Sequence, residues 1–274
     1  MTDQVEDEEL VDEAPHLAPR HMFEVIRREG EEELSRPTKS LIWSGIAAGV
    51  MISFSVLGEA IFRTYLPDSP SSYLIENLGY SLGFLLVILG KLQLFTENTI
   101  TTIFPLVKSP KAHMFAKVAR LWTIVLAANV VGALFAAAVM VFTQAIPSDL
   151  MPAITSLSEH ALGFPPLEAF ARAIPAGVLV AALVWMLPQA AGSSFWVVVT
   201  FTWLIAAGDF THIVAGSVEM WFLLLSGNTG VADAVFAFFI PVFAGNVVGG
   251  SVIFTLMAWG QVQEEVEPKE GNTP

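Results

Sequence analysis

Residues 94–99, LFTENT, interrupt an apolar stretch of the chain, and residues 207–212, AGDFTH, interrupt a later one. Gly208 permits backbone angles that other helical residues resist. Polar residues that are favoured at the start of a helix lie in both breaks, namely Thr96, Asn98, Asp209 and Thr211. In hydrocarbon a broken helix is tolerated only where protein or water meets its loose amides and carbonyls. The two breaks therefore predict helices that restart near the middle of a membrane.

The whole chain has the composition of a membrane protein. Of its 274 residues, 54% are hydrophobic and 14% are charged, against about 45–50% and about 25% in an ordinary globular chain. Seventeen of the 39 charged residues lie within residues 1–39. Six apolar stretches are each long enough for a crossing of roughly 20 residues, and they run over 41–62, 76–106, 118–141, 167–187, 195–225 and 232–259. We expect an all-α integral membrane protein in contact with lipid, with its second and fifth helices broken.

The two halves of the apolar region share short motifs in the same order. The matching pairs are IAAGVMI at 46–52 with IPAGVLV at 174–180, Phe-Thr at 95–96 with Phe-Thr at 210–211, and NVVG at 129–132 with NVVG at 246–249. Each half holds three crossings, so the second copy would be inserted upside down. We predict a transmembrane channel domain at 40–260, with repeats at about 40–143 and 166–260, between an acidic tail at 1–39 and a C-terminal tail at 261–274.

The charges predict the orientation of the chain and exclude some partners. Ten of the 13 lysines and arginines fall before the first stretch, around the loop after the second, or in the C-terminal tail. This bias predicts that both termini are cytoplasmic. The net charge is −13 and there is no basic patch, so no nucleic acid partner is expected. The chain has no cysteine, which excludes disulfides and thiolate metal ligands.

The breaks suggest a chemistry as well as a shape. Each restarted helix would aim free N–H groups and the positive end of its dipole at the bilayer centre, where they would attract a small anion. His212 is the only histidine inside a predicted span. A bare anion is costly to move through an apolar constriction, whereas its neutral acid is not. Histidine titrates near neutral pH, so we predict that His212 exchanges a proton with the solute rather than serving only for packing.

The motifs resemble those of the formate/nitrite transporter family along residues 36–260. The matching pieces are Leu94-Phe95-Thr96, Leu179-Val180, Val184-Trp185-Met186, Phe210, His212, Ile240-Pro241, Gly245-Asn246 and Gly249-Gly250. The resemblance implies an aquaporin-like fold, a homopentamer with one pore per protomer, and passage of small monovalent anions such as formate or nitrite, or of their conjugate acids. It also implies that His212 is the central pore histidine, that Thr96 belongs to a mobile loop, and that Leu94 and Phe95 form a hydrophobic constriction.

Some positions depart from the family pattern and indicate a divergent branch in a bacterial inner membrane. Gln93 stands where an acidic residue is usual, Glu97 where a small one is usual, and Thr211 where a glutamate is usual. Gly177 and Gly216 replace asparagines of the fourth and fifth spans. The changed charge leaves the identity of the solute open.

The remaining polar residues of the spans are candidates for the pore or for its support. Lys91 lies in the second span, where an ionisable residue is costly and normally functional. Two roles are open for it: a buried ion pair with Glu97, Asp209 or Glu219 that locks the broken helices, or binding of the solute in the pore. Asn98 and Thr211 would line the pore. Asn129 and Asn246 would tie the half-helices to their neighbours by hydrogen bonds across helix interfaces.

Two other functions remain open. An aquaporin-type channel for neutral solutes would share the six spans and inverted halves, but both breaks lack Asn-Pro-Ala and one carries a histidine. A non-conducting scaffold or sensor would fit if Gly177, Gly216 and Lys91 left the pore blocked. No glycine-rich nucleotide loop, zinc-ligand spacing or nucleophile–base pair is found in the sequence, so we expect neither an enzyme nor a cofactor or metal.

Overall fold

The computed structural model describes residues 17–190 and 192–266, and every regular element in this part of the chain is helical. The first half contains α2 (Pro19–Ser35), α3 (Thr38–Met51), α4 (Ser53–Tyr65), α5 (Pro70–Glu76), the 3₁₀ turn η1 (Asn77–Tyr80), α6 (Ser81–Leu89), α7 (Phe95–Thr101), α8 (Ile103–Lys108) and α9 (Ala112–Phe142). The second half contains η2 (Ser148–Leu150), α10 (Met151–Leu162), α11 (Pro166–Met186), η3 (Leu187–Gln189), α12 (Ser194–Ala207), α13 (Ile213–Ser226), η4 (Asp233–Phe239), α14 (Ile240–Val247), η5 (Val248–Phe254) and α15 (Thr255–Val266).

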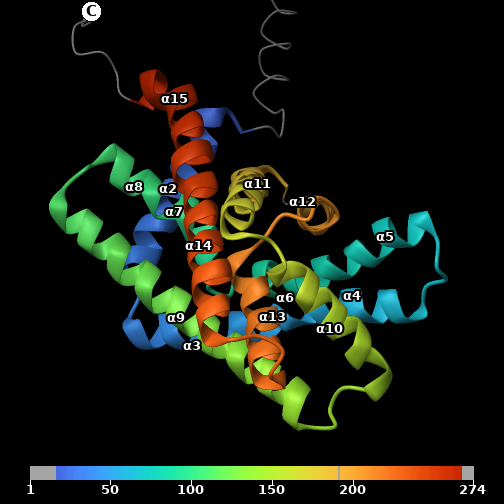
Figure 1. The fold of residues 1–274 in the computed structure, drawn as a ribbon. Helices are drawn as coiled ribbons and strands as arrows, with labels where there is room; N and C mark the ends of the chain where they lie inside the picture. The colour runs from blue at the N-terminus through green and yellow to red at the C-terminus, as the bar shows by residue number, and fades with distance from the viewer. Residues whose placement is uncertain (1–16, 191, 267–274) are drawn as a thin grey trace, which may run out of the picture.

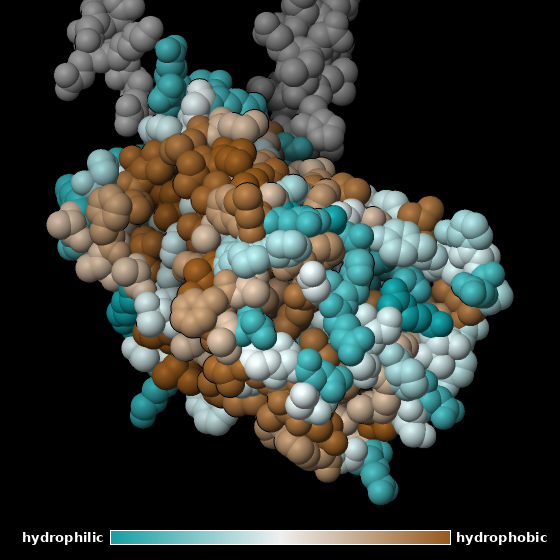
Figure 2. Space-filling model, in the orientation of Figure 1, coloured by the Kyte–Doolittle hydropathy of each residue, from teal (hydrophilic) through white to brown (hydrophobic). Residues whose placement is uncertain are grey.

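Five helical stretches are long and apolar enough to cross a membrane. They are Thr38–Tyr65, Pro70–Leu89, Ala112–Phe142, Pro166–Gln189 and Asp233–Val266. The fifth stretch expected from the sequence, 195–225, consists of two shorter apolar helices, α12 and α13. Figure 2 shows an apolar surface over α9 and over the column of α14 and α15, with hydrophilic residues gathered toward α10, α4 and α5. That surface is the kind that lipid or a second protein covers.

Close contacts between helices recur in the two halves. A Cβ atom on Gly49 of α3 would lie 2.1 Å from the carbonyl oxygen of Asn129 on α9. At the corresponding place in the second half, a Cβ on Gly177 of α11 would lie 2.3 Å from the carbonyl oxygen of Asn246 on α14. Only glycine allows these backbones to approach so closely. A larger residue at position 177 would therefore collide with the backbone of Asn246.

Helix α2 lies at the same end of the molecule as α15 (Figure 1). The ring of Phe23 on α2 lies 5.2 Å from that of Trp259 on α15 and 4.8 Å from that of Phe104 on α8. Phe23 and Ile26 are fully buried. Helix α2, 17 residues long, is therefore docked against the rest of the protein through its apolar side.

The polar side of α2 carries an ion-pair network. Arg27 donates to Glu24 at 2.6 Å and also pairs with Glu31, while Lys108 of α8 lies 3.7 Å from Glu24. The hydrogen bond from Arg27 holds the pKa of Glu24 at about 2, well below its usual 4.5, with further contributions from Arg28 and Lys108. A carboxylate whose pKa is lowered by folding stabilises the folded protein at pH values above its ordinary pKa. This stabilisation is lost as the pH falls through the pKa of the folded state.

We expect Glu24→Gln to loosen α2 slightly at pH 6 and to have no effect near pH 2. The side chain is partly exposed, so the difference should be at most about 1 kcal/mol. Hydrogen exchange of the amides of residues 19–35 in both proteins, measured from pH 6 to pH 2, tests this. Equal exchange at every pH would contradict a stabilising role for the pair.

Candidate functional site

The two helix breaks have the same backbone geometry. Helix α6 ends at Leu89 and α7 begins at Phe95, while α12 ends at Ala207 and α13 begins at Ile213. Lys91 and Asp209 both have a φ of 52°, in the left-handed region. The amide of the following residue reaches back to Val87 O in the first break and to Ile205 O in the second, each at 3.0 Å. The breaks are therefore equivalent with Lys91 matched to Asp209. This register corrects the sequence-based match of 95–96 with 210–211.

An asparagine from another helix holds the start of each half-helix. Asn129 Oδ1 accepts the amide of Phe95 at 2.9 Å, and its Nδ2 donates to Gly45 O and Gln93 O. Asn246 Oδ1 accepts the amide of Ile213 at 2.8 Å, and its Nδ2 donates to Ala173 O and Thr211 O. Both side chains are fully buried. Each asparagine thus joins the extended segment of a break to a neighbouring helix.

The residues expected to cap the half-helices do not cap them. Leu94 precedes α7 and its side chain makes no capping hydrogen bond, while His212 takes the capping position of α13. Thr96 and Asn98 lie within α7 instead. The prediction was wrong because Asn129 and Asn246, which lie on other helices, accept the first amide of each half-helix. A capping side chain within the break would otherwise supply this acceptor oxygen.

The side chain of His212 bridges the two breaks. Its Nε2 lies 2.8 Å from Thr96 Oγ1, and its Nδ1 accepts the amide of Ala215 at 3.3 Å. Both His212 and Thr96 are buried, and the ring of Phe84 packs edge-on at 5.0 Å. Because Nδ1 accepts a hydrogen bond, the ring is neutral in this arrangement and Nε2 carries the proton that Thr96 Oγ1 accepts.

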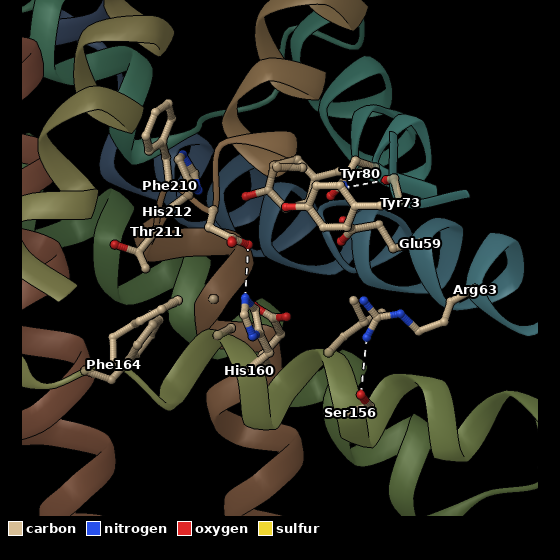
Figure 3. A pocket seen from close by; sticks show the side chains of 18 residues that line it. Glu59, Arg63, Tyr73, Tyr80, Ser156, His160, Phe164, Phe210, Thr211 and His212 are labelled. Atoms are coloured by element: carbon tan, nitrogen blue, oxygen red, sulfur yellow. Dashed lines mark hydrogen bonds and ion pairs between the residues drawn. The ribbon is translucent and has the colours of Figure 1, made fainter. Parts of the chain in front are cut away.

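One cavity opens beside His212, on the side away from α2. It has a volume of about 260 Å³. Figure 3 shows that α4 and its neighbours supply one wall, with Glu59, Arg63, Tyr73 and Tyr80, and that the second break supplies another. Residues whose part in this cavity the sequence did not predict are Glu59, Arg63, Tyr73, Tyr80, His160 and Glu219.

A second cavity lies between α2 and the first break. Its volume is about 360 Å³, and its walls include Lys91, Leu94, Glu97 and Asn98. The Oε1 atom of Glu97 is buried and has no hydrogen-bond partner among the described residues. Asn98 is tied by its Nδ2 to Gln93 Oε1 at 3.3 Å.

The segment from Leu94 to Thr96 separates the two cavities. Leu94 lines the cavity near α2, whereas Thr96 bonds to His212, which lines the other. Phe95 between them is fully buried and stacks on Phe243 at 5.5 Å. Apolar side chains therefore lie between the two cavities, and the hydrogen bond between Thr96 and His212 lies beside them.

Two charged candidates have other partners than those predicted. The Lys91 side chain is 79% exposed and its Nζ lies 4.0 Å from Glu29 of α2. Among the described residues this is the ion pair found for Lys91, and Glu97 lines the same cavity. Lys91 has a left-handed backbone and lines the cavity near α2. Asp209 pairs with His160 Nε2 at 3.0 Å rather than with Lys91.

The remaining candidates have supporting positions. Thr211 Oγ1 donates to Ala169 O at 2.9 Å, which fixes the second break against α11. Gly208 ends α12 with its amide bonded to Leu204 O. A Cβ on Gly216 would lie 2.3 Å from the ring of Phe238, so this ring fills the space that a side chain at position 216 would need. Within 17–190 and 192–266, no cluster of three or more His, Asp or Glu residues is placed to hold a metal.

Long apolar helices, two half-helices that start inside the structure, and a buried histidine between two cavities define a helical membrane protein of the channel or transporter class. The sequence model of the formate/nitrite transporter family matches residues 20–260. The chain belongs to the formate/nitrite transporter family.

Known relatives and solved structures agree with this family. The chain is 40% identical over 248 residues to "Inner membrane protein YfdC" of Escherichia coli K12, covering 90% of this chain and 80% of that protein. It is 27% identical to "Formate channel FocA" of Haemophilus influenzae, over 79% of this chain and 84% of that one. A solved structure described as "Pentameric formate channel with formate bound" superposes with a TM-score of 0.69 at 22% identity, covering 82% of this chain and 98% of the other.

Proposed function

We propose that this protein is a membrane channel or transporter for small monovalent weak-acid anions, such as formate or nitrite, that take up a proton at the site of His212 and cross as the neutral acid. The bond between His212 and Thr96, placed between two cavities, carries this proposal. The FocA relative, which is named a formate channel, supports the class of solute. The departures at Glu97 and Gly216 leave open which anion is preferred.

We propose further that the chain crosses the membrane six times, as two inverted repeats at about 40–143 and 166–260. Helices α2 and α15 lie at the same end of the molecule, which requires an even number of crossings between them. The equivalent breaks and the equivalent asparagines support two copies of one unit. The acidic tail at 1–39 and the tail at 261–274 then flank the channel domain, and parts of both lie outside the described residues.

The cellular setting follows from the relatives and from the charge bias. We propose a bacterial inner membrane, because the YfdC relative is named an inner membrane protein, and cytoplasmic termini, because of the positive-inside bias. A homopentamer is consistent with the exposed apolar faces of α9 and α15, and with the superposed formate channel, which is described as pentameric.

The proposed pore works by reducing the charge that crosses its apolar centre. The start of α13 beside His212 presents the positive end of a 14-residue helix to an anion in the cavity. Thr96 and His212 then offer hydrogen bonds next to Leu94 and Phe95. A bare anion is strongly disfavoured among these side chains, whereas the neutral acid is not. Transfer of one proton therefore decides whether the solute passes.

Uptake into proteoliposomes tests the proposed function. With formate, nitrite, hydrosulfide, acetate and lactate offered separately, we expect uptake of at least one small anion that rises as the external pH falls, because the acid form becomes more abundant. Protein-free liposomes are the control for leakage of the neutral acids. Passage of glycerol or water without any anion would favour a neutral-solute channel, and absence of flux at every pH would favour a scaffold; both results would contradict the proposal.

A further inference from the structure

Two glutamates line the cavity that holds His212. Glu59 is on α4 and Glu219 is on α13, and their side chains are 6% and 8% exposed. Glu219 lies seven residues after His212, two helical turns along, so the same side of α13 faces the cavity at both levels. In the described part of the chain, no hydrogen bond or ion pair is found for either carboxyl group. Figure 3 shows Glu59 on the wall with Tyr73 and Tyr80.

The basic groups of this cavity are bound to other partners. Arg63, one turn after Glu59, donates to Glu76 at 2.7 Å and to Ser156 at 3.2 Å. His160 pairs with Asp209 at 3.0 Å on the rim. The titratable groups that face the two glutamates from the surrounding elements are Arg63, Tyr73, Glu76, Tyr80, His160, Asp209 and His212. An unpaired carboxylate buried in this way is strongly disfavoured. Two carboxyl groups at one cavity are therefore most stable when they hold at least one proton between them.

His212 itself is poorly placed to supply the proton. Its Nδ1 accepts the amide of Ala215, so a second proton on the ring would break that bond. The ring also lies at the start of α13, where the helix dipole opposes a positive charge. A neutral imidazole orients a solute through its Nε2–H but is a weak acid.

We propose that Glu59 and Glu219 form a proton-holding pair that protonates a weak-acid anion in this cavity before it passes Leu94 and Phe95. This inference rests on the proposed function. In the transfer step, the O–H bond of one glutamic acid breaks and an O–H bond forms on the anion held at His212. The carboxylate left behind regains a proton from water in the open cavity, so charge is balanced over each cycle. The solute then crosses the apolar segment as a neutral acid.

The test compares Glu59→Gln, Glu219→Gln and the double variant with the wild type in proteoliposomes that contain a pH-sensitive dye. Glutamine keeps the shape of the side chain but cannot release an acidic proton. At pH 7 we expect formate uptake and the accompanying proton signal to fall about tenfold or more in the double variant. At acidic pH, where the medium itself supplies formic acid, the uptake should return toward the wild-type rate. Hydrogen sulfide, much of which is already in its neutral form at pH 7, should be affected less.

Glu159→Gln is the matched control, because Glu159 is an exposed residue of α10 outside the cavity lining. Unchanged uptake with unchanged pH dependence in the double variant would overturn the proposal. An equal loss for all solutes at every pH would also overturn it, since it indicates a structural role. If the wild type takes up sodium or methylammonium and the double variant does not, the two glutamates form a cation site. That result would also overturn the proposal. A wild-type protein that passes no weak acid at all would contradict the proposed function itself, and the inference with it.

Discussion

His212→Asn is expected to lower the initial rate of formate uptake about a hundredfold, the lower end of the range for loss of a positioned hydrogen-bond donor. The asparagine side chain is shorter, so it cannot reach both Thr96 Oγ1 and the amide of Ala215 as the imidazole does. The solute then loses its hydrogen-bond donor next to Phe95, and the link between the two breaks is lost with it. Stopped-flow measurement of uptake in proteoliposomes from pH 5 to pH 8 gives the rate.

The shape of the pH profile separates His212 from the acidic pair. If His212 orients the solute while Glu59 and Glu219 supply protons, His212→Asn should lower the rate at every pH and keep its rise toward acid. His113→Asn, an exposed histidine on α9, is the matched control and should behave like the wild type. A rate for His212→Asn within about twofold of the wild type would contradict any role of this ring in permeation, because about twofold is only about 0.4 kcal/mol.

The sequence predicts the large features of this fold because they follow from composition and from the properties of a bilayer. Long apolar stretches have few alternatives to helices in lipid, and a glycine followed by polar residues marks the second break. The position of His212 directly after that break was also available from the sequence. Each of these features is determined by residues that are neighbours in the sequence, so the sequence alone predicts it.

The details of the site depend on contacts between segments, which the sequence alone does not give. The side chain of Lys91 is exposed and lies near Glu29 of α2, and composition cannot indicate this. Glu59 and Glu219 are 160 residues apart in the sequence, and each is a single charged residue in an apolar stretch. The sequence therefore does not indicate that they line the same cavity. The repeated letters Phe-Thr predict that Phe95 corresponds to Phe210. The hydrogen bonds from the two asparagines instead show that Phe95 corresponds to Ile213, three residues further along the chain. NVVG was the informative signal, because its asparagine makes the same contacts in both halves.

Asn246→Ala is expected to destabilise the protein by roughly 2 kcal/mol or more and to abolish uptake. The change removes the acceptor of the Ile213 amide and the donor to Ala173 O and Thr211 O. Leaving a buried polar group unsatisfied costs about 1–3 kcal/mol in soluble proteins, and hydrogen bonds between membrane helices average about 0.6 kcal/mol. Thermal unfolding in detergent, followed by tryptophan fluorescence, measures the loss of stability.

If the two halves are copies of one unit, Asn129→Ala should have a similar effect, because Asn129 makes the same three bonds at the first break. Asn228→Ala provides the control, since Asn228 is exposed after α13 and the hydrogen bond found there uses only its backbone amide. Normal stability in either buried variant would show that the break is held by other contacts. Normal stability with lost uptake would instead mean that the asparagine acts on the solute and not on the helix start. If each asparagine fixes the position of its half-helix, both variants should lose stability and uptake together.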